Sequence, residues 1–218
     1  MKFDAIVVGS GMSGAIAAKE LCERGLKVLV LERGKNIDPS EDFTDMVMPW
    51  DYKNNNMVPE DEIARDYAVQ SQCYAFNETT KHFWVKDSEH PYSTPEDKPF
   101  TWIRGYHVGG RSIMWGRQTY RMSEMDFEAN AKDGYGCDWP IRYNDLAPWY
   151  DHIEKFIGVA GSNEGLPQLP DGQFLPPWEM NDAEKLFKAR VEQKFAGRKV
   201  IIGRNANLSV AQPHHIEL

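Results

Sequence analysis

The arrangement of apolar and polar residues near the N-terminus predicts a β-strand, an α-helix and a second β-strand. The strands are expected from continuous apolar runs, and the helix from apolar residues at helical spacing. Residues 5–8 form a short apolar run, and residues 27–31 form a second one after its opening residue Lys27; both contain β-branched side chains, as in strands covered on both faces of a parallel sheet. Gly25 is expected to end the helix between them. Small or apolar side chains at helical spacing predict its buried face, which consists of Ala15, Ala18, Leu21 and Cys22.

A glycine-rich loop, G-S-G-M-S-G, occupies residues 9–14 between the first predicted strand and the helix. Gly9 would permit a tight turn, Gly11 would let the backbone approach a pyrophosphate, and Gly14 would let the helix lie close to the strand. The helix N-terminus would add unpaired N–H groups and the positive end of the helix dipole. An ordinary tight turn in another α/β protein is the alternative interpretation, which the flanking strands and helix disfavour.

An acidic residue, Glu32, follows the second predicted strand at about 20 residues beyond the glycines, the position at which a carboxylate binds ribose hydroxyls. The sequence therefore predicts a dinucleotide site near the N-terminus. Its expected residues are Gly9, Ser10, Gly11, Met12, Ser13, Gly14, Glu32 and Arg33.

The pattern changes over residues 35–99, which are rich in Asp, Glu, Asn and Pro. Disordered segments lack aromatic residues, whereas this segment contains many of them. We therefore predict an ordered excursion that packs on the sheet domain, with a helix near residues 59–67 and a strand within residues 72–85.

A second glycine motif, Gly109-Gly110, lies in an aromatic stretch over residues 102–117. Paired glycines followed by Ser112 let a backbone pass close to a flat ligand while offering N–H donors to it. Taken alone, the pair is also compatible with an ordinary turn. His107, just before the glycines, fits a structural histidine better than a ligand.

Two further helices are predicted in the second half of the chain. One covers residues 143–157 and has Asn144 as its N-cap. The other begins after Asn181, which can form a capping box with Glu184. Its expected buried face consists of Leu186, Phe187, Val191 and Phe195. Residues 199–202 and 207–210 resemble strands.

The composition narrows the class of protein. The chain has 218 residues, 41% of them hydrophobic, and a net charge of -8, so an acidic surface would repel nucleic acid. Neither a membrane span nor a cleavable signal is apparent, which predicts a cytoplasmic protein. Cys22, Cys73 and Cys137 are odd in number and widely spaced, which argues against a disulfide framework and a metal site. Cys22 is expected to be a small core residue.

The unit of residues 4–34, followed by the R-G-x-x-x-G-G-x-S sequence of residues 104–112, resembles the glucose–methanol–choline (GMC) family of flavin oxidoreductases. A third similarity lies in residues 136–150, where a tryptophan precedes a helix that opens with Tyr-Asn-Asp-Leu. The resemblance implies that the first loop holds the ADP half of FAD and the second lies along the isoalloxazine ring. It places Gly109, Gly110, Ser112, Met114 and Trp115 beside that ring.

Two residues refine what the resemblance implies. Met114 occupies the position at which some family members carry a histidine bonded to the flavin, so non-covalent FAD is expected. Trp115 resembles the branch with pyranose oxidases and glycoside 3-dehydrogenases, which indicates a sugar or glycoside as the substrate, within the wider class of sugars and alcohols. The implied reaction is hydride transfer from a CH–OH group to flavin N5, with an electron acceptor that the sequence does not identify.

No catalytic residue is expected within the chain, because the family's catalytic histidine lies near the C-terminus of longer enzymes. His214 and His215 are expected to be exposed. The resemblance therefore implies the N-terminal part of a longer enzyme, completed by further chain or by a partner subunit. A non-catalytic dinucleotide-binding or assembly subunit, an alcohol or choline oxidoreductase, and a nicotinamide dehydrogenase remain the alternatives.

These expectations combine into an α/β fold. Residues 1–35 and 101–125 would form a Rossmann-like FAD-binding domain with a doubly wound parallel sheet. Residues 36–100 would be the excursion packed on it. Residues 126–218 would contain helices, loops and the start of a second, substrate-binding α+β domain.

Overall fold

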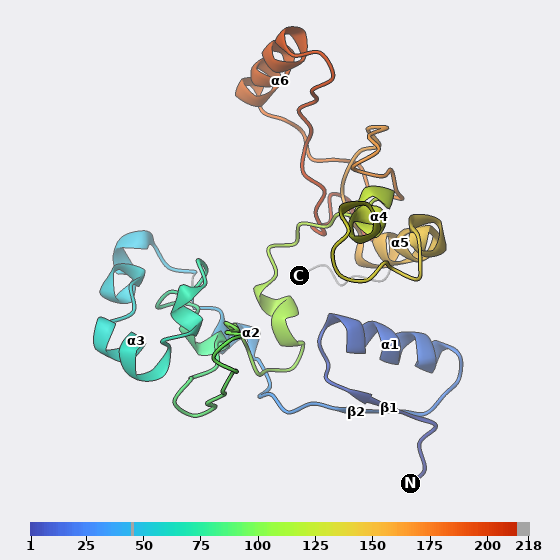
Figure 1. The fold of residues 1–218 in the computed structure, drawn as a ribbon. Helices are drawn as coiled ribbons and strands as arrows, with labels where there is room; N and C mark the ends of the chain where they lie inside the picture. The colour runs from blue at the N-terminus through green and yellow to red at the C-terminus, as the bar shows by residue number, and fades with distance from the viewer. Residues whose placement is uncertain (45, 213–218) are drawn as a thin grey trace. The chain divides into compact units, whose positions relative to one another are not determined.

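The computed structural model describes residues 1–44 and 46–212 (Figure 1). The chain divides into two compact units, Met1–Trp115 and Gly116–Leu218. His214 and His215, which were predicted to be exposed, lie outside the described residues. The domain boundaries predicted at residues 35, 100 and 125 stay predictions.

The first unit opens with the predicted βαβ arrangement: β1 (Ala5–Val8), α1 (Met12–Glu23) and β2 (Val28–Leu31). The strands pair in parallel, from Ala5 opposite Val28 to Val8 opposite Leu31. A helix that connects two adjacent parallel strands is the basic unit of a Rossmann-like sheet. The predicted α/β fold class is therefore confirmed.

The exposure of the two strands differs from the prediction. Helix α1 packs on the face that carries Val7, whereas Ile6 and Val8 on the opposite face are 62% and 82% exposed. Cys22 is also exposed, so its prediction as a core residue is wrong. Within the described part of the chain the sheet has only these two strands, and nothing covers its second face.

The excursion is ordered, with two short helices, α2 (Pro39–Asp42) and α3 (Glu60–Asp66). Helix α3 confirms the helix predicted near residues 59–67. The strand predicted within residues 72–85 is wrong, because a 3₁₀ turn over Lys81–Phe83 occupies this segment. The side chain of Asn77 accepts backbone hydrogen bonds from Thr79 (3.1 Å) and Thr80 (3.0 Å). These local bonds favour a turn over a strand ladder.

Aromatic rings form a small core inside the excursion. The ring of Phe76 lies 5.1 Å from that of Tyr67 and 6.3 Å from that of Trp84. Beside them, the side chain of the fully buried Gln70 accepts a hydrogen bond from the Arg104 backbone N–H (2.7 Å). The aromatic residues from which an ordered excursion was predicted therefore pack on one another in part.

In the described residues of the second unit, 116–212, there are three α-helices: α4 (Glu124–Asp133), α5 (Tyr143–Ile157) and α6 (Asp182–Lys194). Asn144 was predicted to cap α5, but the N-cap is Arg142, whose backbone N–H donates to the Asp145 carboxylate (2.8 Å). The predicted capping box of α6 is confirmed by hydrogen bonds of 3.0 Å and 2.8 Å between Asn181 and Glu184.

Side-chain burial on α6 contradicts the predicted buried face. Leu186, Phe187 and Phe195 are 53%, 60% and 50% exposed. Apolar residues at helical spacing do not determine whether a partner covers that side of the helix.

The strands predicted over residues 199–202 and 207–210 are also not formed. Asn205 instead makes isolated bridges with Gln118 and Ala160. Its side chain accepts a hydrogen bond from the Asn207 backbone N–H (3.1 Å), and this Asx turn interrupts the extended backbone.

A buried ion pair connects the segment before α4 with α5. Arg121 Nε donates to Glu154 Oε1 at 2.7 Å, and Arg121 Nη1 donates to the Tyr143 hydroxyl at 3.0 Å. Asp151 also accepts from this guanidinium. The side chains of Arg121 and Glu154 are 4% and 5% exposed, so each charge depends on the other for compensation.

Among the described residues, no helix is long and apolar enough to cross a membrane.

Candidate dinucleotide site

The first glycine loop has the geometry that its sequence predicts. Gly9 has a φ of +91°, which glycine adopts without strain and which permits the tight turn after β1. A Cβ on Gly14 would lie 2.0 Å from the carbonyl oxygen of Gly9, so only glycine allows α1 to approach the strand this closely. A Cβ on Gly11 would meet nothing nearer than 4.0 Å.

The N-terminus of α1 faces the space beside this loop. The first turn begins with the hydrogen bond from Ala15 N–H to the Gly11 carbonyl (2.8 Å). The N-cap residue Gly11 has no side chain that could bond the free N–H groups of the first turn that follows it, and this turn contains no acidic residue. These groups and the helix dipole therefore offer an anion-binding position.

Glu32, just after β2, holds the first glycine loop in place through hydrogen bonds to its carboxylate. One carboxylate oxygen, Oε2, accepts from the Ser10 backbone N–H (2.8 Å) and from the Ser10 hydroxyl (2.7 Å). The other, Oε1, accepts from the backbone N–H groups of Arg33 and Gly34, both at 2.8 Å. Hydrogen bonds that favour the charged form, those from Ser10 foremost, lower the Glu32 pKa to about 2.

The second glycine loop lies against the first, which sequence reasoning did not foresee. Gly109 has a φ of +86°, and its backbone N–H donates to the Ser10 hydroxyl at 2.9 Å. A Cβ on Gly110 would lie 3.2 Å from the Cα of Gly11. The two loops, separated by about a hundred residues of sequence, therefore meet backbone to backbone through Ser10.

A short parallel pairing holds the second loop beside the end of β2. Lys35 N–H donates to the Tyr106 carbonyl (3.3 Å), and Val108 N–H donates to the Lys35 carbonyl (2.9 Å). A Cβ on Gly34 would lie 2.2 Å from the His107 backbone nitrogen, so this crossing needs glycine. In the Glu-Arg-Gly sequence after β2, Gly34 thus allows the second loop to pass close to the end of β2, while Glu32 and Arg33 are the residues predicted to contact the cofactor.

Two hollows flank the Gly9 turn. The larger, of about 630 Å³, is bordered by the residues Val8, Gly9, Gly11, Met12, Ser13, Gly14, Arg111, Ser112 and Trp115. The smaller, of about 280 Å³, is bordered by Val8, Gly9, Leu31, Glu32 and Arg33. The structure therefore brings the predicted glycine-loop residues together with Ser112 and Trp115.

The remaining predicted residues take other places. Ser10, Gly109 and Gly110 form the joint between the loops. Met114 does not border either hollow; its terminal methyl lies 2.8 Å from the position of a Cβ on Gly105.

Arg111 borders the larger hollow, although sequence reasoning did not select it. Its guanidinium donates to the Ile103 carbonyl (3.1 Å) and is otherwise exposed. A basic residue between two glycines and a serine, close to a predicted phosphate cradle, is the signal that could have identified it.

His107 is fully buried behind the second loop, in line with the structural role that its position indicates. Its ring meets that of Phe83 edge to face, with centroids 5.8 Å apart. Neither ring nitrogen has a hydrogen-bond partner among the described residues. Burial lowers the pKa of His107 and favours the neutral ring.

Comparisons with known proteins agree with this architecture. A family model described as an NAD(P)-binding Rossmann-like domain matches residues 7–42. The chain is 29% identical to the fructose dehydrogenase large subunit of Gluconobacter japonicus, over 81% of this chain and 31% of that protein. It is 29% identical to the paromamine 6'-oxidase of Streptomyces fradiae, over 86% of this chain and 28% of that protein. It is 28% identical to the gluconate 2-dehydrogenase flavoprotein of Pantoea cypripedii, over 83% of this chain and 30% of that protein.

The chain therefore spans about three-tenths of the length of these relatives. They are named as dehydrogenases and oxidases, and one as a flavoprotein, which fits the predicted resemblance to the N-terminal part of a GMC oxidoreductase. The family match identifies a nucleotide-binding, Rossmann-like domain over residues 7–42, and the relatives that match most of the chain are oxidoreductases by name.

Proposed function

We propose that this chain is the FAD-binding part of a GMC oxidoreductase that oxidises a CH–OH group of a sugar or related alcohol. The observation that carries the proposal is the joint between the two glycine loops, where Gly109 N–H bonds to Ser10 beside the larger hollow. One loop supplies the phosphate cradle of a dinucleotide, and the other supplies a flat backbone surface next to it.

The residues present fit FAD. The empty space at Gly11, the open N-terminus of α1 and the guanidinium of Arg111 suit a pyrophosphate. Glu32 and Arg33, on the other side of the Gly9 turn, would hold the adenosine half. Ser112 and Trp115 would lie beside the isoalloxazine, which when bound supplies the hydride acceptor.

Glu32 would serve two purposes in such a site. A carboxylate offers about four acceptor positions, and protein donors already use four of them. Ribose hydroxyls would therefore share Glu32 with Ser10. The loop is held in place by the same group that recognises the sugar of the cofactor.

The names of the relatives support the substrate class. They act, as named, on fructose, paromamine and gluconate, all of which carry CH–OH groups. Trp115 borders the larger hollow, in keeping with the sugar-oxidising branch that it resembles.

We propose no catalytic base within this chain; the base would come from further chain or from a partner subunit. A cytoplasmic location remains part of the proposal.

Non-covalent FAD follows from Met114, whose thioether cannot form the histidyl bond found in some family members. The protein is purified, precipitated with acid and washed. Yellow colour in the supernatant is the expected result. Colour that stays with the pellet would show a covalent flavin and would contradict the proposal.

The match to an NAD(P)-binding Rossmann-like domain keeps a nicotinamide dehydrogenase as the second candidate. A purified protein with the visible absorption of an oxidised flavin supports the first proposal. A colourless protein that binds NAD but not FAD would support the second. Dye reduction with sugars, aliphatic alcohols, choline and aryl alcohols then tests the substrate class. Turnover of choline or aryl alcohols without any sugar would overturn the sugar assignment, and flavin binding without any turnover would favour a non-catalytic subunit.

A further inference from the structure

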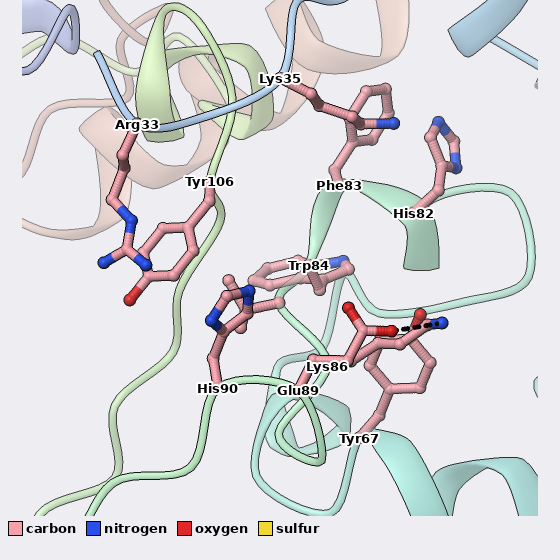
Figure 2. A pocket seen from close by; sticks show the side chains of 11 residues that line it. Arg33, Lys35, Tyr67, His82, Phe83, Trp84, Lys86, Glu89, His90 and Tyr106 are labelled. Atoms are coloured by element: carbon pink, nitrogen blue, oxygen red, sulfur yellow. Dashed lines mark hydrogen bonds and ion pairs between the residues drawn. The ribbon is translucent and has the colours of Figure 1, made fainter. Parts of the chain in front are cut away.

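A third hollow, of about 400 Å³, lies between the end of β2 and the excursion and has no role in the proposed reaction. In Figure 2, Arg33 and Tyr106 lie together on one side, Lys86 and Glu89 on the other, with Trp84 between them. Its lining combines basic side chains with aromatic rings, a combination that suits a ligand with both negative charge and a flat ring.

The charges around this hollow are predominantly positive. Arg33 stacks on the Tyr106 ring at 3.8 Å and makes no ion pair with any described residue. Lys35 pairs with Asp42 at 3.4 Å, and Lys86 pairs with Glu89 at 3.0 Å.

Both lysines are more than a third exposed, with side-chain exposures of 53% and 42%. Such solvent-exposed pairs are weak, so these ammonium groups stay available to an anion. Three cationic side chains therefore border the hollow with a single bordering carboxylate, that of Glu89.

One residue that borders the hollow, Trp84, carries an unsatisfied hydrogen-bond donor. Trp84 is 5% exposed, and its buried Nε1–H has no partner among the described residues. A buried donor without a partner is costly, whereas a ligand oxygen would satisfy it. Because Trp84 borders the hollow, a small rotation of its side chain would bring this N–H to an acceptor atom of a ligand.

We infer that this hollow binds a small organic anion with a flat ring, such as an aromatic carboxylate, at a site separate from the dinucleotide site. Arg33 and Lys35 would attract the anionic group, Tyr106 and Phe83 would contact the ring, and Trp84 would donate to an oxygen. Arg33 borders both this hollow and the smaller one at Gly9, so the test must separate the two ligands.

The probes are benzoate and benzamide, which share a ring and differ in charge. Each is titrated by calorimetry into the full protein, with and without saturating FAD. Benzoate is expected to bind in both cases, with benzamide at least about tenfold weaker. Equal binding of the two probes, or no benzoate binding, would overturn the inference. Benzoate binding that FAD abolishes would also overturn it, because the hollow would then belong to the dinucleotide site.

Variants locate the bound probe. Trp84→Phe removes the indole N–H together with the five-membered ring that carries it, and should weaken benzoate at least about two- to tenfold, the effect expected for the hydrogen bond alone. Lys35→Met should weaken it by about two- to fivefold, in the range of an exposed charge interaction. Lys98→Met, an exposed lysine of the same unit that does not border the hollow, is the matched control and should change nothing. Unchanged affinity in both test variants would place the probe elsewhere.

A spectroscopic measurement covers the case in which Trp84→Phe does not fold. The indole ¹⁵N–H signal of Trp84 in the unmodified protein should shift on addition of benzoate and stay in place with benzamide. Among the seven tryptophans, Trp84 can be assigned by sequential NMR assignment of the unmodified protein. If no tryptophan indole signal moves while benzoate binds, the assignment of this hollow is wrong.

Discussion

The backbone N–H of Gly109 donates a 2.9 Å hydrogen bond to the hydroxyl of Ser10, a residue 99 positions earlier in the chain. The same hydroxyl donates to Glu32 at 2.7 Å. One serine thus connects the first glycine loop, the end of β2 and the second glycine loop. The shape of the candidate cofactor site depends on this side chain.

Replacement of Ser10 by alanine should therefore loosen the site. Ser10→Ala removes two hydrogen bonds, each contributing about 0.5–1.5 kcal/mol, and should weaken FAD binding by about one to two decades. Fluorescence titration with FAD measures the effect. Ser71→Ala, in the same unit but away from both hollows, is the control. An unchanged FAD affinity in Ser10→Ala would show that the loops hold their places without this link.

Two glycines of the same loop should respond differently to alanine. In Gly14→Ala the new Cβ would lie 2.0 Å from the Gly9 carbonyl oxygen, so stability should fall by about 3 kcal/mol or more. Gly11→Ala has an unstrained backbone and space for the methyl, so it should fold normally yet bind FAD poorly.

Urea unfolding and FAD titration of both glycine variants separate the two effects. Normal FAD affinity in Gly11→Ala would contradict the proposed pyrophosphate position. Unchanged stability of Gly14→Ala would contradict the close approach of α1 to the strand.

Glu32 should make stability depend on pH in the acid range. Its pKa is lowered from 4.5 to about 2 in the folded protein, so its contribution is present above about pH 4.5 and is lost as the pH falls towards 2. Glu32→Gln has no such titration. The difference in unfolding free energy between the original protein and Glu32→Gln should therefore shrink from about pH 6 to about pH 3. A difference that stays constant over this range would show that Glu32 is not held by these hydrogen bonds.

The buried pair of Arg121 and Glu154 should stabilise the second unit. Arg121→Met leaves the Glu154 carboxylate buried without its partner and should cost about 3–5 kcal/mol of stability. Lys132→Met breaks the exposed pair with Glu128 and should cost less than about 1 kcal/mol. Chemical denaturation of both variants provides the comparison. Equal losses of unfolding free energy in the two variants would indicate that burial does not determine how much an ion pair contributes to stability.

The parts of the fold that the sequence predicted are local ones. Strand β1, helix α1 and the glycine turn follow from residues within one continuous stretch, whose spacing and glycine conformations decide the structure. The wrong predictions of burial arose where the result depends on distant residues. The exposure of Phe187 on α6 and of Val8 in β1 depends on which surfaces are covered, and periodicity carries no information on that.

The candidate site was predicted in pieces but not as a whole. Each glycine motif can be found from its own spacing, whereas the bond between Gly109 and Ser10 joins segments whose separation leaves no local pattern. Arg111 was missed for a similar reason, since only the approach of the two loops places it beside the hollow. The strand predicted near Asn77 failed because side-chain hydrogen bonds to the backbone outweighed β-propensity.

The distance along the chain between Ser10 and Gly109 also bears on the order of folding. The strands and the helix of the βαβ unit pair and pack with segments close in sequence, so the unit can form early, whereas the second loop reaches Ser10 only after the intervening excursion has become compact. Closing so long a loop is slow and entropically costly, so the cofactor site would be completed last. Refolding followed by flavin fluorescence should then lag behind the recovery of helical circular dichroism. Substitutions in the aromatic core around Tyr67 would delay cofactor capture without touching the cofactor.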